Sequence, residues 1–349
     1  YHLHMPSYFL ETFTEYPYVN QEGYVPTTYT RIREQNLAGY AQYNHPLPFG
    51  QANIGLRYEH VDFDYFENGT FVPGQSRVYD NIFPNISVNG QLGKVQFQVS
   101  YAAKTQRPNY SQLRNNITYA NRFTWQTGNP LLKPSVTHDI TAVGVWRFFQ
   151  AMVSYKVVRD YILYWGTQVE NQSATTLINY INHDRLPSLT VMLAASPTIG
   201  IWNLNASAIV MKQWFSLDAA GQRRTYNNPL FVGSLNNTFT LPAGFLLSAD
   251  FNYQSRGQVQ NITLKRPQYT LNIGLRKSLF NDALSIEARA NDLLLGCKQE
   301  ALLYMESAQM KDLSWSDTRS FSLTVRYKFN AAKSKYKGTG AGQDTINRM

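Results

Sequence analysis

The sequence predicts an all-β protein, a transmembrane antiparallel up-and-down β-barrel, and three observations support this class. Residues 321–329 alternate strictly between large apolar and polar side chains, so this segment forms a strand with one apolar and one polar face. The same alternation recurs about a dozen times with no helical pattern between, as in membrane barrels. The mean hydropathy is −0.37, and no apolar run reaches the ~18 residues that indicate a membrane-spanning helix.

The composition agrees with this prediction. The 349 residues include 24 Tyr, 19 Phe and 6 Trp, and barrels place aromatic side chains in girdles at both membrane interfaces. The formal net charge is +9. Because the basic residues are scattered through strands and loops, a cationic lumen or contact with anionic headgroups is favoured over nucleic-acid binding. The one cysteine, Cys297, excludes an internal disulfide.

The predicted elements start after an N-terminal region. Residues 1–30 lack sustained alternation, so we expect an extracellular loop region that contains the end of a strand at residues 8–14. Strands then follow in pairs around short turns, most of which contain Gly, Pro or Asn, the residues of hairpin turns. The pairs join residues 37–43 with 52–61, 82–88 with 95–104, 139–147 with 151–165, 186–195 with 201–215, 230–241 with 245–255, and 268–277 with 284–292, before a last strand at 315–329.

The other connections are long, and they span residues 62–78, 105–135, 166–182, 216–228, 256–267 and 293–314. Short turns at one rim and long loops at the other are typical of outer-membrane barrels, whose short turns face the periplasm. The last strand therefore ends at the periplasm. Strands and loops of the barrel occupy residues 31–329, and the basic, Gly-rich residues 330–349 are expected to form a periplasmic tail.

Single strands predict which face meets lipid. Along residues 245–253 the odd positions are Phe, Leu, Ala, Phe and Tyr, whereas the even positions from 248 to 254 are Ser, Asp, Asn and Gln. On the next strands Glu287 and Arg289 must face the lumen, because a charge on the lipid face costs up to ~2–4 kcal/mol near the midplane. A large soluble β-sandwich is the alternative, but its strands are usually shorter and its long loops are not confined to every second connection.

About thirteen strands are predicted in all, whereas bacterial single-chain barrels have an even number because both chain ends lie in the periplasm. Two explanations are open. Either residues 1–30 contain a further strand, or the chain lacks the N-terminal half of a larger barrel.

Two motifs follow the strand at residues 97–101. They are R-P-N-Y-S-Q-L at residues 107–113 and G-N-P-L-L-K-P-S at residues 128–135. Together with residues 83–88 and 97–101, they resemble the barrel of TonB-dependent outer-membrane receptors, although the family usually has Glu where this chain has Ser135. The tail at residues 333–343 resembles the Bacteroidetes branch, which carries an outer membrane β-barrel domain at its C-terminal end.

The resemblance covers the chain from about residue 31 to its end and implies a barrel of ~22 strands around an N-terminal plug. Neither the plug nor the motif that contacts TonB is visible, so the chain resembles the C-terminal barrel portion, with residues 1–30 as an extracellular loop. The resemblance implies location in the bacterial outer membrane. The implied partners are outer-membrane lipids, TonB through a plug not present in this chain, a small or oligomeric nutrient ligand and a surface lipoprotein lid, with no nucleic acid.

The long loops supply the candidate ligand-binding residues, because Tyr and Trp offer rigid contact area and Arg grips anionic groups. The candidates are Arg107, Tyr110, Arg114, Trp125, Arg223, Arg224 and Tyr226. For the two motifs a structural role is the stronger hypothesis, since their prolines fix the backbone and Gly128 permits a tight turn. For residues 223–226 a solvated loop is the alternative. Phe329, the aromatic end of the last strand, resembles the signal that the barrel-assembly machinery recognises.

No enzyme, cofactor or metal site is predicted. The sequence lacks a Ser/His/Asp set, a Gly-rich phosphate loop and zinc-ligand spacing. The spaced carboxylates at residues 62–67 are too few for a calcium loop, and His2 and His4 have no further ligand near them in the sequence.

Three functional hypotheses remain open. The leading one is the barrel of a TonB-dependent transporter that binds a siderophore, cobalamin, glycan or peptide at its extracellular loops for energised uptake. The second is an autonomous passive pore of about fourteen strands, with one strand from residues 1–30. The third is a scaffold subunit of a larger envelope complex.

Overall fold

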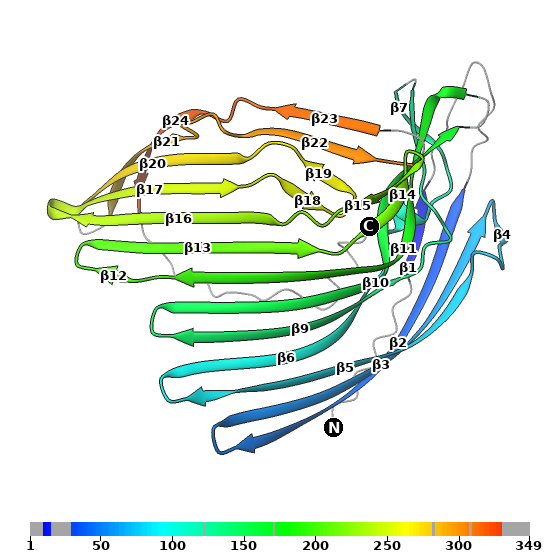
Figure 1. Cartoon of the computed structure of the whole chain (residues 1–349), viewed down its shortest axis with the longest axis horizontal. Coiled ribbons are helices and arrows are strands. Elements are labelled where there is room, and N and C mark those ends of the chain that lie inside the picture. Colours follow the sequence, from blue (N-terminus) through cyan, green and yellow to red (C-terminus); the bar gives the residue numbers. More distant parts are fainter. Residues whose placement is uncertain are drawn as a thin grey trace.

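The computed structural model describes residues 10–14, 29–121, 123–169, 172–280, 283–306 and 309–329. These residues form a large curved wall of antiparallel strands, with smaller sheets at one end (Figure 1). Within these ranges no helix is long and apolar enough to cross a membrane. The rest of the predicted N-terminal loop region, the histidines His2 and His4, and the predicted tail at 330–349 lie outside the described residues.

The wall contains thirteen long strands, each antiparallel to the next along the chain. They are β2 (Thr30–Leu47), β3 (Gly50–Glu67), β5 (Arg77–Leu92), β6 (Val95–Gln106), β9 (Ser135–Trp146), β10 (Phe149–Val169), β11 (Gln172–Ala195), β13 (Trp202–Gln213), β16 (Leu230–Leu241), β17 (Phe245–Gln254), β20 (Gln268–Leu279), β21 (Leu284–Asn291) and β24 (Ser320–Tyr327). This confirms the predicted all-β class and up-and-down order. A further short strand, β1 (Leu10–Thr14), pairs with β2 where the end of a strand was expected.

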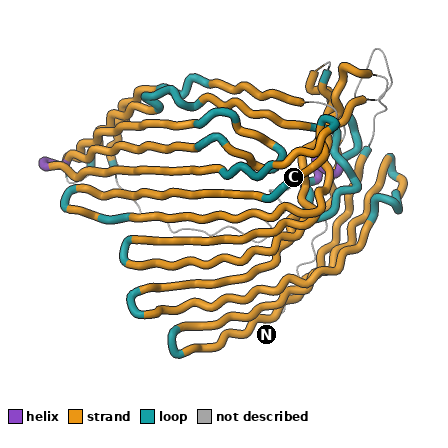
Figure 2. The backbone as a smooth tube through the Cα atoms, in the orientation of Figure 1, coloured by secondary structure: helices purple, strands orange, loops and turns teal. Residues whose placement is uncertain are grey.

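The wall is not closed by any pairing among the described residues. β24 pairs with β21, β1 pairs with β2, and no pairing joins these two edges of the wall within that part of the chain. Figure 2 shows the strands as a succession of hairpins between these edges.

The connections divide the wall into a short-turn end, at the left in Figure 1, and a long-connection end. Turns at residues 48–49, 93–94 and 147–148 join neighbouring strands directly, and the 3-10 turn η1 (Pro242–Gly244) joins β16 to β17. Left-handed backbone at Gly93, Arg147 and Ala243 suits such tight hairpins. The predicted short turns are therefore present, and longer connections alternate with them except between β10 and β11.

Side chains of the wall alternate between an apolar outer face and a polar inner face, as predicted. One row across β16, β17 and β20 contains Leu235, Phe251 and Leu271, and the neighbouring row contains Asn236, Asp250 and Asn272. On the polar face, Arg289 Nη2 lies 3.2 Å from Asp250 Oδ2, so these two charges meet away from lipid. On the apolar face, Leu323 of β24 keeps 71% of its surface exposed.

The predicted loop at residues 166–182 is wrong, because β10 and β11 continue as one hairpin up to the pair Val169–Gln172. These strands have 21 and 24 residues, whereas ~9–11 residues span a membrane. About half of this hairpin therefore projects beyond the bilayer. The extension was not predicted because neither face of the hairpin contacts lipid beyond the membrane, so polar residues there replace the strict alternation of apolar and polar side chains.

Three further predicted loops contain sheets of their own. Residues 216–228 form the hairpin β14 (Ser216–Ala219) and β15 (Gln222–Thr225). The other two loops combine into one four-stranded sheet of β18 (Gly257–Val259), β19 (Ile262–Leu264), β22 (Lys298–Tyr304) and β23 (Gln309–Trp315). The last predicted strand is too long at its start, since Trp315 belongs to β23. Shorter elements are β4 (Thr70–Phe71), α1 (Tyr110–Leu113), β7 (Thr118–Asn121), β8 (Thr124–Gln126) and β12 (Thr198–Ile199).

Two buried apolar clusters lie at the long-connection end. The helix cluster contains Ile32, Phe63, Tyr65, Tyr110, Leu113 and Leu132. The hairpin cluster contains Leu163, Trp165, Leu186, Phe215, Leu217, Ala219 and Tyr226. The projecting β10–β11 hairpin separates them, because Ile162 packs on the helix cluster whereas its neighbour Leu163 belongs to the hairpin cluster, and neighbouring strand residues point to opposite faces.

Candidate ligand-binding site

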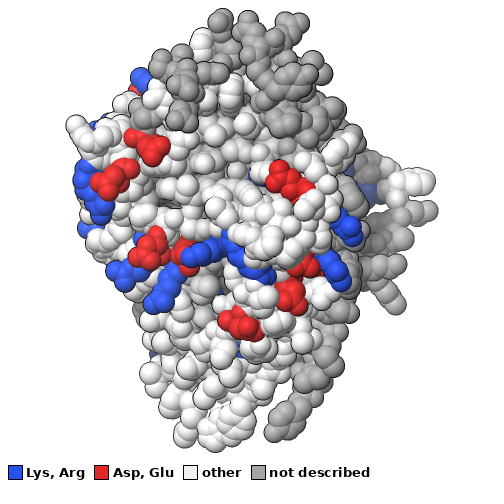
Figure 3. Space-filling view, turned by 90° about the vertical axis from the view of Figure 1, so that its right-hand side faces the viewer, with Lys and Arg blue, Asp and Glu red and all other residues white. Residues whose placement is uncertain are grey.

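Charged side chains gather at the long-connection end. Figure 3 looks onto this end and shows Lys, Arg, Asp and Glu side chains in a band across its middle. Ion pairs at this end include Arg223 with Asp218, and Arg266 and Lys311 with Glu300. Arg107 forms a further, nearly buried set with Glu34 and Glu59.

Arg107, a predicted ligand-binding residue, is held between two carboxylates. Its Nη2 donates a hydrogen bond to Glu59 Oε1, and its Nη1 lies 3.6 Å from Glu34 Oε1. The carboxylate side chains of Glu34 and Glu59 are only 7% and 5% exposed, and that of Arg107 is 17% exposed. Asn36 Nδ2 also donates to Glu59 Oε1 at 2.7 Å. The arrangement therefore fixes the start of the R-P-N-Y-S-Q-L motif against β2 and β3.

The rest of this motif forms α1, which closes over the inner face of β2 and β3. Tyr110 and Leu113 are buried in the helix cluster. A capping box joins Asn109 and Gln112, which satisfies backbone donors of so short a helix. Tyr110, the second predicted ligand residue, is thus 9% exposed and packs as a core residue.

The G-N-P-L-L-K-P segment is held by contacts with β5, with the projecting hairpin and with the end of α1. Arg77 donates from Nη1 to the Leu132 carbonyl at 3.1 Å and from Nη2 to the Pro130 carbonyl at 3.0 Å. Asn129 Nδ2 donates to the Tyr180 carbonyl at 2.9 Å. A Cβ on Gly128 would lie 2.5 Å from the Arg114 and Gln112 carbonyl oxygens, so only glycine fits there. These contacts are those of a structural clamp between α1, β5 and the projecting hairpin.

Arg114 and Trp125 lie between the two motifs. Arg114 follows α1 directly, is half-buried and already engages neighbouring residues. Trp125 lies on β8, which pairs in parallel with residues 176–178 of β11. Its ring meets that of Tyr119 edge-on at a centroid distance of 4.9 Å, and half-burial leaves part of the indole accessible.

Arg223, Arg224 and Tyr226 come together on or beside the β14–β15 hairpin. Arg223 Nη1 lies 3.1 Å from Asp218 Oδ2, with the Arg223 side chain 66% exposed. The Arg224 guanidinium covers the Tyr304 ring at 3.7 Å. Tyr226 is 1% exposed, and burial raises the pKa of its phenol to about 12. Of these three, Arg223 is therefore the residue most open to a ligand.

The predicted residues form two sets on opposite faces of the projecting hairpin. Tyr110 belongs to the helix cluster, and Arg107 immediately precedes its helix. Tyr226 belongs to the hairpin cluster, and Arg223 and Arg224 lie on the strand before it. One small ligand would not touch both sets without movement of β10 and β11.

A cationic pocket at the base of the four-stranded sheet was not predicted from the sequence. It has a volume of about 390 Å³ and is lined by Arg266, Pro267, Tyr269, Leu294, Leu295, Gly296 and Lys298. Arg266 and Lys298 are 32 positions apart in the sequence and are brought together by the pairing of β19 with β22 and by the bridge between Tyr269 and Gly296. A carboxylate or phosphate suits this pair of cations, but no local sequence pattern announces the pocket.

No group of three or more His, Cys, Asp or Glu side chains suited to a metal ion occurs in the described part of the chain. Phe329, the proposed assembly signal, lies two residues beyond β24 and is 81% exposed. The backbone of its neighbour Lys328 still donates to the Ala283 carbonyl at 2.8 Å, so pairing with the preceding strand region continues almost to this aromatic.

The wall, its two-faced strands and its charged open end define a β-barrel protein of the bacterial outer membrane. Residues 8–327 match the outer membrane protein beta-barrel family, and the chain belongs to this family. A comparison with curated protein sequences gave no match.

Solved structures of outer-membrane transporters share the fold. The FrpB iron transporter from Neisseria meningitidis (F3-3 variant) gives a TM-score of 0.55 at 14% identity over 86% of this chain and 45% of that chain. The copper transporter OprC gives 0.61 at 12% identity over 90% and 51%. The Serratia marcescens hemophore receptor HasR, solved with its hemophore HasA and heme, gives 0.54 at 13% identity over 87% and 60%. The chain thus spans about half the length of these structures.

Proposed function

We propose that this chain is the barrel portion of a TonB-dependent receptor that binds a nutrient at its long-connection end for energised uptake. The observation that carries the proposal is the absence of pairing between β24 and β1 within the described residues. Thirteen long strands with two unjoined edges fit a segment of a larger barrel better than an autonomous pore of about fourteen strands, which would need those edges to meet.

The likeness to transporters supports the same proposal. FrpB is an iron transporter and OprC is a copper transporter, and HasR is a receptor whose structure contains a hemophore and heme. For the present chain the nutrient class stays open among siderophore, cobalamin, glycan and peptide, because specificity depends on loops more than on fold.

Among the seven candidate residues, the accessible ones are the best ligand contacts. Arg223 offers an exposed guanidinium, and Trp125 offers part of an aromatic surface. Arg107, Tyr110 and Tyr226 instead hold the loops in place, so their effect on a ligand would be indirect. A plug that contacts TonB and a surface lipoprotein lid are further partners in this proposal.

Energised uptake can be tested against passive flow. The native protein, purified from outer membranes, should give no steady conductance in a planar bilayer, and radiolabelled nutrient uptake by cells should stop when a protonophore collapses the inner-membrane potential. Steady conductance together with uptake that survives the protonophore would contradict the proposal and favour the passive pore. Stable co-purification with other envelope proteins, combined with unchanged uptake in a deletion strain, would favour the scaffold.

A further inference from the structure

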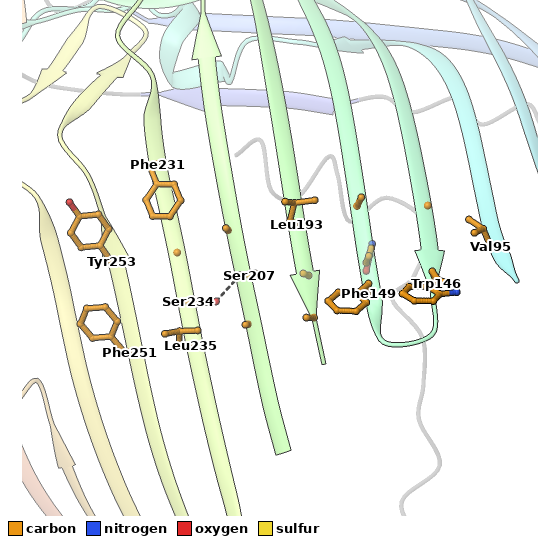
Figure 4. A pocket seen from close by; sticks show the side chains of 18 residues that line it. Val95, Trp146, Phe149, Leu193, Ser207, Phe231, Ser234, Leu235, Phe251 and Tyr253 are labelled. Carbon is orange, nitrogen blue, oxygen red and sulfur yellow. Dashed lines mark hydrogen bonds between the residues drawn. The ribbon is translucent and has the colours of Figure 1, made fainter. Parts of the chain in front are cut away.

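An apolar trough of about 740 Å³ lies on the outer face of the wall and crosses β9, β10, β11, β13, β16 and β17 (Figure 4). Its floor consists of small residues, namely Gly144, Ala151, Ala195, Ala206, Ala208 and Gly233. Larger side chains rise on either side, with Trp146 and Phe149 at one end and Phe231, Phe251 and Tyr253 at the other.

The trough follows from strand register. One row runs Trp146–Phe149–Ala195–Ala206–Leu235–Phe251, and the next runs Gly144–Ala151–Leu193–Ala208–Gly233–Tyr253. Side chains in such rows share one face of the sheet, here the outer face that carries Leu235 and Phe251. Leu193 interrupts the second row, so the depression runs from Gly144 and Ala151 past Ala195 and Ala206 of the first row to Ala208 and Gly233. Ser207 and Ser234 bond to each other at 2.7 Å, so their hydroxyls offer little to the trough.

Its dimensions suit a single hydrocarbon chain. Four strand spacings separate Gly144 on β9 from Gly233 on β16, which at ~4.8 Å each gives ~19 Å. One leaflet contributes ~15 Å, half of the ~30 Å hydrocarbon core. An acyl chain of a membrane lipid can therefore lie along the trough and fill it.

The short-turn end of the trough carries positive charge. Trp146 and Phe149 stack at a centroid distance of 5.9 Å, and the guanidinium of Arg147 lies 5.1 Å from the Trp146 ring. Because Trp146 borders the trough, this cation lies at its mouth. Lys94 occupies the neighbouring turn, since Val95 pairs with Trp146, and residues 93–94, 147–148 and 196–201 contain no Asp or Glu.

We propose that the trough and Arg147 form a binding site for one anionic glycerophospholipid of the periplasmic leaflet. One acyl chain occupies the small-residue floor, and the phosphate pairs with Arg147 and Lys94 at the short-turn end, which faces the periplasm. Dispersion contacts with the floor and charge-assisted hydrogen bonds at the mouth act on the same molecule. The proposal commits to this occupant because an apolar trough that ends in cations matches a lipid with an anionic head.

Native mass spectrometry of the protein purified from outer membranes tests this site, with phosphatidylglycerol, uncharged diacylglycerol or lipopolysaccharide added in turn. The wild type should retain one phosphatidylglycerol. Ala208→Trp, which fills the floor, should lower that retention at least tenfold, whereas Ala288→Trp should not, because Ala288 is exposed on the same face beside Leu275 and Leu323 outside the trough. If Ala208→Trp fails to fold, Ala206→Leu replaces it.

The charge is tested separately. Arg147→Gln should bring phosphatidylglycerol retention down to that of diacylglycerol, and Lys277→Gln, a cation near the short-turn end of β20 beside Phe245, should leave the preference unchanged. Equal retention by the Ala208 and Ala288 variants would overturn the site. Preferential retention of lipopolysaccharide would overturn its assignment to the periplasmic leaflet.

Discussion

The guanidinium of Arg107 and the carboxylate of Glu59 form an ion pair that is almost sealed from water, with the Glu59 side chain 5% exposed. This pair joins the start of the α1 segment to the inner face of β3 across 48 positions of sequence. Arg107 was predicted as a ligand contact, and this ion pair shows that it instead supports the structure of the long-connection end.

Arg107→Gln should destabilise the protein strongly, because it removes the cation that two nearly buried carboxylates, Glu34 and Glu59, share, and the other arginine near Glu59, Arg57, lies 3.8 Å away. Removing one partner of a buried pair costs roughly 3–5 kcal/mol. Arg223→Gln is the matched control, since its pair with Asp218 is exposed and such pairs contribute ~0–1 kcal/mol. Urea unfolding in detergent, followed by tryptophan fluorescence, measures both. Equal midpoints for the two variants would show that the Arg107 pair is not a structural support.

Gly128→Ala should weaken the clamp between the two motifs. The new Cβ would lie 2.5 Å from two carbonyl oxygens, and such overpacking costs about 1–3 kcal/mol. Gly74→Ala provides the control, because nothing lies within 4 Å of a Cβ there. We expect faster protease cleavage within residues 107–134 for the first variant alone, read by peptide mapping. Unchanged cleavage would mean that the loop can shift to accept the methyl group.

A pair of neighbouring substitutions on β24 tests which face meets lipid. Leu323→Arg places a charge on the outer face and should cost about 2–4 kcal/mol near the bilayer midplane. Thr324→Arg points to the opposite face, opposite Glu287, and should be nearly neutral. Folding yields in lipid vesicles, measured by gel mobility of unheated samples, compare the two. The reverse order would invert the assignment of the faces.

The four-stranded sheet should lose stability in acid through Glu300. A hydrogen bond from Lys311 holds the pKa of this carboxyl below its usual range, and Lys311 Nζ lies 2.9 Å from Glu300 Oε1. The stabilisation is present above the ordinary carboxyl pKa and disappears as the pH falls through the lowered value. Hydrogen exchange of β22 and β23, corrected for intrinsic rates, should therefore accelerate in acid.

Lys311→Gln should flatten this pH dependence, because it removes the first cause of the lowered pKa. Asp218→Asn, in the separate β14–β15 hairpin, should leave it unchanged. An acid response of β22 and β23 that persists in the Lys311 variant would assign the effect to another group.

The strands could be predicted because each is specified by its own alternation. Phe251 faces out and Asp250 faces in for reasons that are local to β17, and most of the short turns contain Gly, Pro or Asn, the exception being residues 147–148. The long connections have no such local rule. Leu303 pairs with Ile262 across a distance that no periodicity covers, and β10 continues beyond the membrane where polar residues blur its pattern.

The candidate site was harder to predict for the same reason. The sequence around a loop arginine does not show whether its guanidinium is exposed, as in Arg223, or paired with buried carboxylates, as in Arg107. Only the fold brings Glu34 and Glu59 next to Arg107, because even the nearer of the two, Glu59, lies 48 positions away in the sequence. The positions of Glu34 and Glu59 in their strands indicate side chains that face the lumen, but they do not indicate an ion pair with a distant arginine.

The pairing of β19 with β22 binds two surface connections into one unit. Residues exposed to the outside of a cell are under pressure to vary, and a solitary loop can change without consequence for its neighbour. Here an exchange that replaced residues 256–267 alone would remove β19, one of the two strands that pair with β22, and would take Ile262 away from the cluster around Leu303. We therefore expect natural variants to inherit these two segments together, so that they form one antigenic block with a shared evolutionary history.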